Sequence, residues 1–282
     1  MIKVTIVLVL YNCILEESLT FQTLKNHLDI FHKLKIAYEF IIYDNSLASL
    51  GIADCAEFNI KYIHDSRNLG IATAYNYALN IGIENGSKWI LLLDQDTEIT
   101  CEYVSEILFN CKTLQEEVAI VPRIISNKKI VSPMFQYGLR VEMIDLEKLS
   151  TSEKDEKCLM TCINSGAMIN INFLEKIGGF NEKEFPLDFL DFWLFLQIHQ
   201  LKAKVYILKS TLSHNLSVSD YNSLSLKRYM SILNSEILFV TKYRREQLGK
   251  YKSRLFIRFF KQLFLVKNKK IAYYTLSKRM EM

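Results

Sequence analysis

Residues 89–96 read Trp89-Ile90-Leu91-Leu92-Leu93-Asp94-Gln95-Asp96, an apolar run that stops at two carboxylates separated by one residue. Five consecutive apolar residues cannot alternate between two faces, so the run predicts a strand covered on both sides, as in α/β proteins. Ligands of such sheets collect at the carboxyl ends of the strands. Asp94 and Asp96 there suit Mg²⁺ or Mn²⁺ that also takes oxygens from a diphosphate. A turn capped by one Asp is the structural alternative.

Strand and helix patterns alternate from the beginning of the chain to this run. We expect strands over Val4–Leu10, Tyr38–Tyr43 and Ile60–Ile63, and helices over Glu16–Leu34 and Ile71–Asn85. This order predicts parallel neighbouring strands joined by right-handed crossovers. Polar tips follow the strands at Tyr11-Asn12, Asp44-Asn45-Ser46, Arg67-Asn68 and Asp94-Gln95-Asp96. Each tip alone is typical of a cap or turn, but together they predict a nucleotide-sized cleft.

Composition narrows the class of protein. The chain has 282 residues, half of them hydrophobic, which is enough for a large core. Met1–Leu10 is short, carries Lys3 and precedes no small-residue cleavage site, so it predicts a first strand and not a signal peptide. The six cysteines show no Cys-x-x-Cys spacing, which indicates reduced thiols and a cytoplasmic protein. Glycine-rich phosphate loops are absent from the sequence, which argues against dinucleotide oxidoreductases and P-loop enzymes.

The net charge of +4 conceals an uneven distribution. Thr241–Met282 carry 13 basic and two acidic residues, whereas residues 1–240 carry 22 basic and 29 acidic residues. An acidic body with a basic tail predicts two functional regions, of which the tail faces an anionic partner.

The ordered set of motifs resembles the family 2 inverting glycosyltransferases of the GT-A fold, especially the rhamnosyltransferase-like members that build bacterial polysaccharides such as capsule or O-antigen. The resemblance covers roughly residues 1–220 and implies a Rossmann-like, mostly parallel sheet flanked by helices. It leaves residues 221–282 as a basic, helical C-terminal extension. The matching segments are Tyr11-Asn12, Asp44-Asn45-Ser46, Arg67-Asn68-Leu69-Gly70-Ile71-Ala72-x-Ala74-x-Asn76, Leu93-Asp94-Gln95-Asp96, Asn164-Ser165-Gly166-Ala167, Ile177-Gly178-Gly179-Phe180-Asn181-Glu182, Asp188 to Asp191, and His214.

The resemblance also implies roles for single residues. In that family the Asp after the second strand reads the nucleobase, which corresponds to Asp44 here. The Asp-x-Asp motif holds the metal, Mn²⁺ or Mg²⁺, and the ribose, which implicates Asp94 and Asp96, and His214 completes the metal shell. The catalytic base corresponds to Asp191. The other candidates for nucleotide-sugar binding are Tyr11, Asn12, Asn45, Arg67, Asn68, Gly70, Asn76, Gln95, Ser165 and Gly166.

The chemistry of inverting sugar transfer calls for the same set of groups. A cation serves the departing diphosphate, and a carboxylate on the opposite side of the sugar accepts the proton of the acceptor hydroxyl. Phe185–Trp193 supplies Asp188 and Asp191 in apolar surroundings, which raise a carboxylate's pKa. The family's usual Glu-Trp and Arg do not follow Asp191, so an alignment slip of three residues would make Asp188 the base. A helix-capping role is the structural alternative for both.

Two other functions remain open: a nucleotidyltransferase and a non-catalytic nucleotide-sugar-binding protein. The former would carry a glycine-rich basic loop after the first strand, where this chain has Tyr11–Glu16. The processive Gln-x-x-Arg-Trp signature is absent from the sequence, which favours addition of a single sugar. The family resemblance implies dTDP-rhamnose or a UDP-hexose as the donor. The expected acceptor is a hydroxyl of a growing, lipid-linked cell-surface glycan.

The C-terminal tail and one internal segment complete the expectations. Lys250, Arg254, Arg258 and Lys261 fall on one side of a helix, with Phe256, Phe259, Phe260, Leu263 and Phe264 largely opposite. This pattern predicts a basic amphipathic helix that lies on an anionic membrane, without nucleic-acid binding. The family resemblance implies that this membrane surface is the inner face of the bacterial plasma membrane. Packing on the catalytic domain or in a homodimer is the alternative. Pro122–Cys158 is expected to be irregular, as a mobile loop over the acceptor or as a surface excursion.

Overall fold

The computed structural model describes residues 1–49, 51, 58–126, 129–137, 140–143, 158–214, 222 and 224–282. The chain divides into two compact units, which are described separately. Unit 1 comprises Met1–Phe135 and Glu142–Asn215, and unit 2 comprises Gln136–Val141 and Leu216–Met282. The elements are β1 (Ile2–Leu10), η1 (Leu15–Glu17), α1 (Leu19–Leu24), η2 (Lys25–His27), α2 (Asp29–Lys33), β2 (Ile36–Asp44), β3 (Ile60–His64), α3 (Ile71–Glu84), β4 (Trp89–Asp94), β5 (Thr97–Glu98), α4 (Cys101–Thr113), β6 (Glu117–Ser126), β7 (Lys129–Ser132), β8 (Met134–Tyr137), β9 (Arg140–Met143), β10 (Cys158–Thr161), β11 (Met168–Asn170), α5 (Ile171–Ile177), α6 (Leu190–Gln200), β12 (Lys204–His214), α7 (Leu226–Tyr243), η4 (Arg245–Gln247), α8 (Leu248–Leu265) and α9 (Lys269–Glu281).

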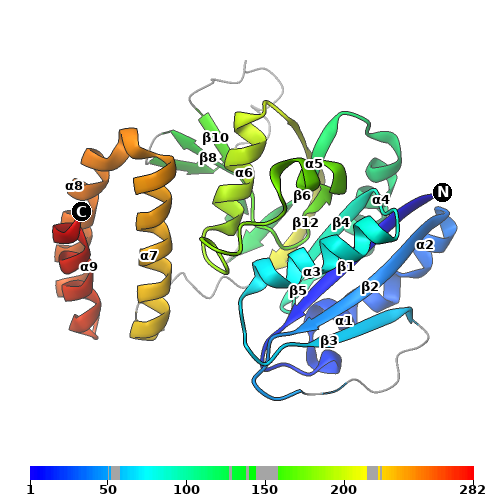
Figure 1. Cartoon of the computed structure of the whole chain (residues 1–282), viewed down its shortest axis with the longest axis horizontal. Helices are drawn as coiled ribbons and strands as arrows, with labels where there is room; N and C mark the ends of the chain where they lie inside the picture. Colours follow the sequence, from blue (N-terminus) through cyan, green and yellow to red (C-terminus); the bar gives the residue numbers. More distant parts are fainter. Residues whose placement is uncertain are drawn as a thin grey trace. The chain divides into compact units, whose positions relative to one another are not determined.

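The main sheet of unit 1 has the strand order β3-β2-β1-β4-β11-β6-β12-β5, with β7 paired to β6. Figure 1 shows β3, β2, β1 and β4 side by side in this sheet. The long strands β3, β2, β1 and β4 are parallel neighbours, as are β6 and β12. The short strands β5, β7 and β11 pair antiparallel. The sheet is therefore mixed, with its long pairings parallel, and the α/β architecture expected from the alternating pattern is confirmed.

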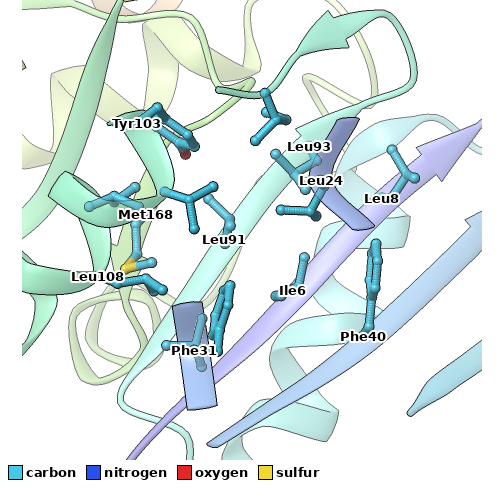
Figure 2. Close-up of a cluster of buried hydrophobic side chains, with 14 of the residues drawn as sticks. Ile6, Leu8, Leu24, Phe31, Phe40, Leu91, Leu93, Tyr103, Leu108 and Met168 are labelled. Carbon is cyan, nitrogen blue, oxygen red and sulfur yellow. The ribbon is translucent and has the colours of Figure 1, made fainter. Parts of the chain in front are cut away.

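A buried apolar cluster fills one face of this sheet. Alternate residues of β1, from Val4 to Leu10, enter the cluster together with side chains of α1, α2 and α4. Figure 2 shows that cluster, with Ile6, Leu8, Leu24, Phe31, Phe40, Leu91, Leu93, Tyr103, Leu108 and Met168 labelled. On the opposite face, α3 approaches β1 so closely that a Cβ added at Gly82 would lie 2.8 Å from Thr5 Oγ1. Helices on both faces explain why β1 and β4 are almost wholly apolar.

Two expected segments differ from the structure. The single helix expected over Glu16–Leu34 was wrong, because the chain forms two short α-helices separated by the 3-10 turn η2. The helix begins at Leu19 because Ser18 precedes it as N-cap, with its Oγ accepting from Phe21 N at 3.3 Å. Within α1, Thr20 Oγ1 contacts the carbonyl of Asp94 and accepts from Thr97 N at 2.9 Å. The irregular segment expected from Pro122 was also wrong, since β6 continues to Ser126 and β7, β8 and β9 follow. Residues 144–157 lie outside the described part of the chain.

Helices α7, α8 and α9 make up the described C-terminal part of unit 2. Their apolar core consists of Tyr229, Leu233, Val240, Tyr251, Leu255, Val266 and Ile271. One polar side chain from each helix joins a buried triad, in which Gln262 donates to Tyr229 at 2.8 Å and Thr275 donates to Gln262 at 2.7 Å. The hydroxyls of Tyr229 and Thr275 close the triad at 2.6 Å. Among the described helices, none has both the length and the apolar character needed to span a bilayer.

Candidate active site

The register of the parallel strands brings the predicted polar tips to one edge of the sheet. Leu10 of β1 lies opposite Asp44 of β2, and Val9 lies opposite Asp94 of β4. Direct hydrogen bonds join the residues that follow. Asn12 N donates to Ser46 Oγ at 2.8 Å, and Tyr11 N donates to the side-chain oxygen of Gln95 at 2.8 Å. Tyr11, Asn12, Asp44 and Gln95 therefore meet, as their positions after strands predicted.

Asp44 is held in a fixed orientation at the end of β2. Its side chain is buried, with one oxygen accepting from Ser46 N at 2.8 Å and the other from Tyr62 OH at 2.6 Å. Burial and the bond to Asp44 raise the pKa of Tyr62, which keeps its hydroxyl a donor. Tyr62 was missed by the sequence reasoning. Its signal is the parallel pairing of β2 with β3, which sets Tyr62 opposite Ile42.

Arg67, a predicted nucleotide contact, forms a bidentate ion pair with Asp65. Its Nε and one terminal nitrogen each lie 2.8 Å from a carboxylate oxygen of Asp65, which also accepts from Tyr43 OH at 2.8 Å. The guanidinium holds the pKa of the Asp65 carboxyl well below its usual range. Asn68 follows with a φ of 48°, a left-handed conformation that Asn tolerates. Arg67 is thus oriented by its neighbour, and its contact with nucleotide stays a prediction.

Gly70 and Asn76 connect α3 to the segment that precedes α6. Gly70 has a φ of 99°, and a Cβ there would lie 2.3 Å from the carbonyl oxygen of Pro186. That carbonyl accepts from Ala72 N at 3.0 Å. The Asn76 amide accepts from Phe180 N at 2.8 Å and donates to Phe180 O at 2.9 Å. The structure gives both residues a positioning role, while their predicted contact with the nucleotide sugar stays a prediction.

Ser165 and Gly166 pack against the segment Asp94–Asp96, which is called the acidic tip. Ser165 Oγ accepts from Asp94 N at 3.2 Å and lies 2.7 Å from Thr97 Oγ1. Gly166 has a φ of 79°, and a Cβ there would lie 2.6 Å from a side-chain carbon of Leu212. Both residues are buried, whereas Asp94 is partly buried and Asp96 is exposed. The serine fixes the backbone of the acidic tip, and the glycine permits the close packing beneath it.

The acidic tip fits a divalent cation that shares its shell with a substrate. Among the side chains that the structure describes, no group of three or more His, Cys, Asp or Glu could hold a metal by itself. Mg²⁺ needs only one or two carboxylates where phosphate oxygens supply further ligands, so Asp94 and Asp96 are a suitable set. Strand pairing sets His214 opposite Thr97, one residue after Asp96. The side chain of His214 lies outside the described part, so its ligation stays a prediction.

Asp191 lies in the first turn of α6, and this helix begins directly after the left-handed Phe189, whose φ is 65°. One of its oxygens accepts from Phe192 N at 2.9 Å. Burial raises the pKa of Asp191 to about 7, and the nearby negative charges of Asp188 and Asp94 act in the same direction. Asp191 is therefore a carboxylate that can take up a proton near neutral pH and that lies within electrostatic reach of the acidic tip.

Tyr75 of α3 is a site residue that the sequence reasoning missed. Its ring is fully buried against Phe180, and its hydroxyl donates to Asp94 Oδ1 at 3.3 Å. Burial, Asp94 and Asp191 all raise the pKa of Tyr75, so the hydroxyl keeps its proton. Tyr75 occupies an unspecified position of the Arg67–Asn76 motif. The available signal was that a buried tyrosine hydroxyl needs a polar partner.

A sheet edge that gathers Asp44, the Asp94–Asp96 tip and Asp191 defines a candidate group-transfer enzyme of the α/β class. Residues 5–178 match the model of Glycosyl transferase family 2, and because the match exceeds half of the chain, the chain belongs to this family. No curated protein sequence matches it. The expectations of a family 2 glycosyltransferase and of a transferase enzyme are therefore confirmed. The expected rhamnosyltransferase-like specificity is not confirmed by this match.

Solved structures share the fold at low sequence identity. GalNAc-T7, crystallised with UDP, GalNAc and Mn²⁺, is similar with a TM-score of 0.60 and 12% identity over 99% of this chain and 55% of that chain. Residues 1–349 of S. aureus TarS are similar with a TM-score of 0.50 and 15% identity over 99% of this chain and 88% of that one. The chain thus spans about half the length of the GalNAc-T7 chain. These likenesses confirm the GT-A-like fold with C-terminal helices.

Proposed function

We propose that this protein is a metal-dependent inverting glycosyltransferase that moves one sugar from a nucleoside-diphosphate sugar to an acceptor hydroxyl. The observation that carries the proposal is that Asp94 and Asp191 interact electrostatically with each other and with Tyr75, which is also hydrogen-bonded to Asp94. A protein that only bound nucleotides would need the acidic tip but no separate proton acceptor. The glycosyltransferase family of the chain supports the same conclusion.

In the proposed reaction, the acceptor oxygen attacks the anomeric carbon of the donor sugar while the bond from that carbon to the diphosphate oxygen breaks. The new bond forms on the face opposite to the leaving group, so the configuration inverts. Asp191 accepts the proton that the acceptor hydroxyl loses. A carboxylate whose pKa is raised to about 7 is a stronger base than an exposed aspartate and is still ionised in a useful fraction near neutral pH. Asp188, the alternative base, lies three residues earlier, in the turn that precedes α6.

Asp94 and Asp96 are the residues proposed to hold Mn²⁺ or Mg²⁺, together with His214. When bound, the cation supplies positive charge to the departing phosphate oxygens. The protein's own contribution is to keep the two carboxylates at the strand tip, because Ser165 and Thr20 hold the backbone of Asp94. The crystallisation of GalNAc-T7 with Mn²⁺ supports the choice of metal.

The family resemblance and the fold relatives support a nucleotide-sugar donor, and the resemblance alone suggests the acceptor. Asp44 is proposed to read the base of a uridine or thymidine nucleotide, with Tyr11, Asn12, Asn45, Arg67 and Asn68 around it. dTDP-rhamnose and the UDP-hexoses are the donors to test first, and the UDP in the GalNAc-T7 structure supports a nucleotide sugar. We propose a lipid-linked glycan as the acceptor. The enzyme would then work at the inner face of the plasma membrane, with residues 1–220 as catalytic domain and residues 221–282 as membrane-facing extension.

The deciding experiment incubates the protein with a panel of nucleotide sugars, simple glycan acceptors and Mn²⁺ or Mg²⁺. The expected result is glycoside formation with inverted anomeric configuration, detected by NMR, and loss of activity with a chelator. Transfer of the nucleoside monophosphate group to an acceptor, with release of sugar 1-phosphate, would instead identify a nucleotidyltransferase. Binding of the nucleotide sugar without turnover across donors and acceptors would identify a non-catalytic binder.

A further inference from the structure

Helix α8 has two different apolar faces, and unit 2 uses only one of them for its own packing. The packed face consists of Tyr251, Leu255, Phe259 and Gln262, all of them buried. Beside it, Arg258 forms a bidentate ion pair with Glu236 of α7, with both N–O distances 2.7 Å. The sequence predicted a basic side of this helix that includes Arg258 and an opposite apolar side that includes Phe259, and this prediction was wrong in part. Phe259 faces the interior of unit 2, and Arg258 is engaged with α7.

The second face of α8 is an exposed stripe of Phe256, Phe260 and Phe264, spaced four residues apart. Phe264 has 77% of its surface exposed, and Phe256 and Phe260 are each more than two-fifths exposed. Tyr273 of α9, 60% exposed, extends the stripe, because its ring lies 6.4 Å from that of Phe259, which itself lies 5.0 Å from Phe260. Large aromatic side chains that gather on one exposed surface mark an interaction site. We call Phe256, Phe260, Phe264 and Tyr273 the aromatic stripe.

Basic residues border the aromatic stripe on both sides. At 100° per residue, Lys250 and Lys261 fall on one flank and Lys252 falls on the other. Arg279 of α9 lies on the Lys252 side, since its guanidinium is 4.8 Å above the ring of Phe256 and its Nε donates to Lys252 O at 3.1 Å. Leu216–Met282 contain 15 basic and four acidic residues. The surface thus combines an apolar centre with a cationic border.

We propose that the aromatic stripe docks unit 2 on an anionic lipid bilayer, with α8 parallel to the surface and its phenylalanines in the interface. An anionic surface complements the basic border, and the apolar centre gains by leaving water. A second copy of this chain is the less favoured occupant, because two such surfaces would bring their lysines together. The proposal names the face that binds the proposed membrane partner, and it does not depend on whether the protein transfers sugars.

The test uses the full-length protein and vesicles of phosphatidylcholine with or without phosphatidylglycerol. Cosedimentation should occur with the anionic vesicles at low salt and weaken as salt rises. Phe256→Ser/Phe260→Ser/Phe264→Ser should reduce the binding constant by at least about tenfold. Lys250→Glu/Lys261→Glu should also reduce it by about tenfold or more, since each basic residue near the surface adds attraction. The matched controls on unit 1 are Phe109→Ser, at a 60% exposed position of α4, and Lys129→Glu/Lys176→Glu.

A spectroscopic readout locates the contact. Both native tryptophans, Trp89 and Trp193, are buried in unit 1. Phe260→Trp should therefore give a blue-shifted emission with anionic vesicles, and Phe109→Trp should not. Absent binding at low salt, equal binding to neutral vesicles, or equal losses in the controls would overturn the proposal. So would conversion of a dimer to a monomer by the triple serine variant, without an effect on vesicles. Mn²⁺-dependent nucleotide binding by the triple serine variant should stay unchanged, which separates this proposal from the proposed catalysis.

Discussion

Tyr75 donates a hydrogen bond to Asp94 across 3.3 Å, from a buried position on α3 to the end of β4. Two further hydrogen-bond contacts come from the same helix. Ala72 N donates to Pro186 O, and the Asn76 side chain bonds the backbone N and O of Phe180. One helix therefore holds both the acidic tip and the segment that leads to Asp191. The two halves of the proposed chemistry are positioned by one rigid element, although more than 90 residues separate them in the sequence.

Tyr75→Phe should lower kcat/KM by about tenfold or more, since a hydrogen bond to a charged group contributes roughly 1.5–3 kcal/mol. Packing against Phe180 is retained in this variant, so its thermal unfolding midpoint should change little. Steady-state kinetics and calorimetry check the two expectations. The matched control is Tyr77→Phe, two residues further along α3, whose ring packs on Tyr43. An equal loss in both variants would show that Tyr75 acts only through the stability of α3.

Asp191→Asn should reduce kcat by about 10²- to 10⁴-fold, the usual contribution of a general base. Donor binding should remain nearly intact, because the base acts on the acceptor in the transition state. Single-turnover kinetics and calorimetric titration with a nucleoside diphosphate measure the two effects. Asp188→Asn is the comparison: if it loses the activity while Asp191→Asn keeps it, Asp188 is the base.

The raised pKa of Asp191 predicts opposite pH effects on activity and stability. Activity should rise as pH increases through about 7, because only the ionised carboxylate accepts a proton. The free energy of unfolding should fall as pH rises from about 4 to 7. In this range Asp191 keeps its proton in the folded protein, whereas the unfolded chain releases it near pH 4. Asp191→Asn should remove this slope and raise the free energy of unfolding at pH 8 by on the order of 2–4 kcal/mol. Denaturant titrations of the metal-free protein from pH 4 to 8 provide the measurement.

Much of the site could be predicted from sequence because it depends on strand ends. Once Trp89–Asp94 is recognised as a buried strand, the parallel register places Asp94 beside the tips of β1 and β2. The same logic could not place Tyr75 or Asn76, since their partners lie on other elements. Asn76 reaches Phe180 across 104 residues of sequence, a contact that local pattern does not encode.

The single helix predicted over Glu16–Leu34 was wrong, because the spacing of apolar residues does not mark where a helix begins or is interrupted. Helical spacing of apolar residues was present, but Thr20 bonds the backbone at Asp94 and Thr97, and Thr23 Oγ1 accepts from Ile99 N at 3.0 Å. These bonds attach α1 to the acidic tip across more than 70 residues of sequence, a contact that local spacing does not encode. The prediction for helix α8 was wrong in part for a different reason. Periodicity identifies an amphipathic helix, but it does not say which of two apolar faces packs against the neighbouring helices.

Asp96→Ala should weaken Mn²⁺ binding and donor binding together, since the metal is proposed to link this carboxylate to the diphosphate. Loss of one carboxylate ligand should raise the metal concentration for half-maximal activity by at least about tenfold. Electron paramagnetic resonance of free Mn²⁺ measures the affinity directly. The matched control is Glu98→Ala, an exposed carboxylate on β5 two residues away. Unchanged Mn²⁺ affinity in Asp96→Ala would remove this residue from the metal site.

Gly70→Ala should destabilise unit 1 and reduce activity, because the added Cβ would lie 2.3 Å from the carbonyl of Pro186. The backbone there, with a φ of 99° and a ψ of 178°, is also essentially restricted to glycine. Gly86→Ala is the control, since Gly86 has a φ of 66° but open space around its Cβ position. It should cost only the roughly 1–2 kcal/mol of a left-handed residue, whereas Gly70→Ala should cost more. Because Pro186 precedes Asp191 by five residues, Gly70→Ala should also lower kcat, and an equal stability loss in both variants would show that the segment moves away without strain.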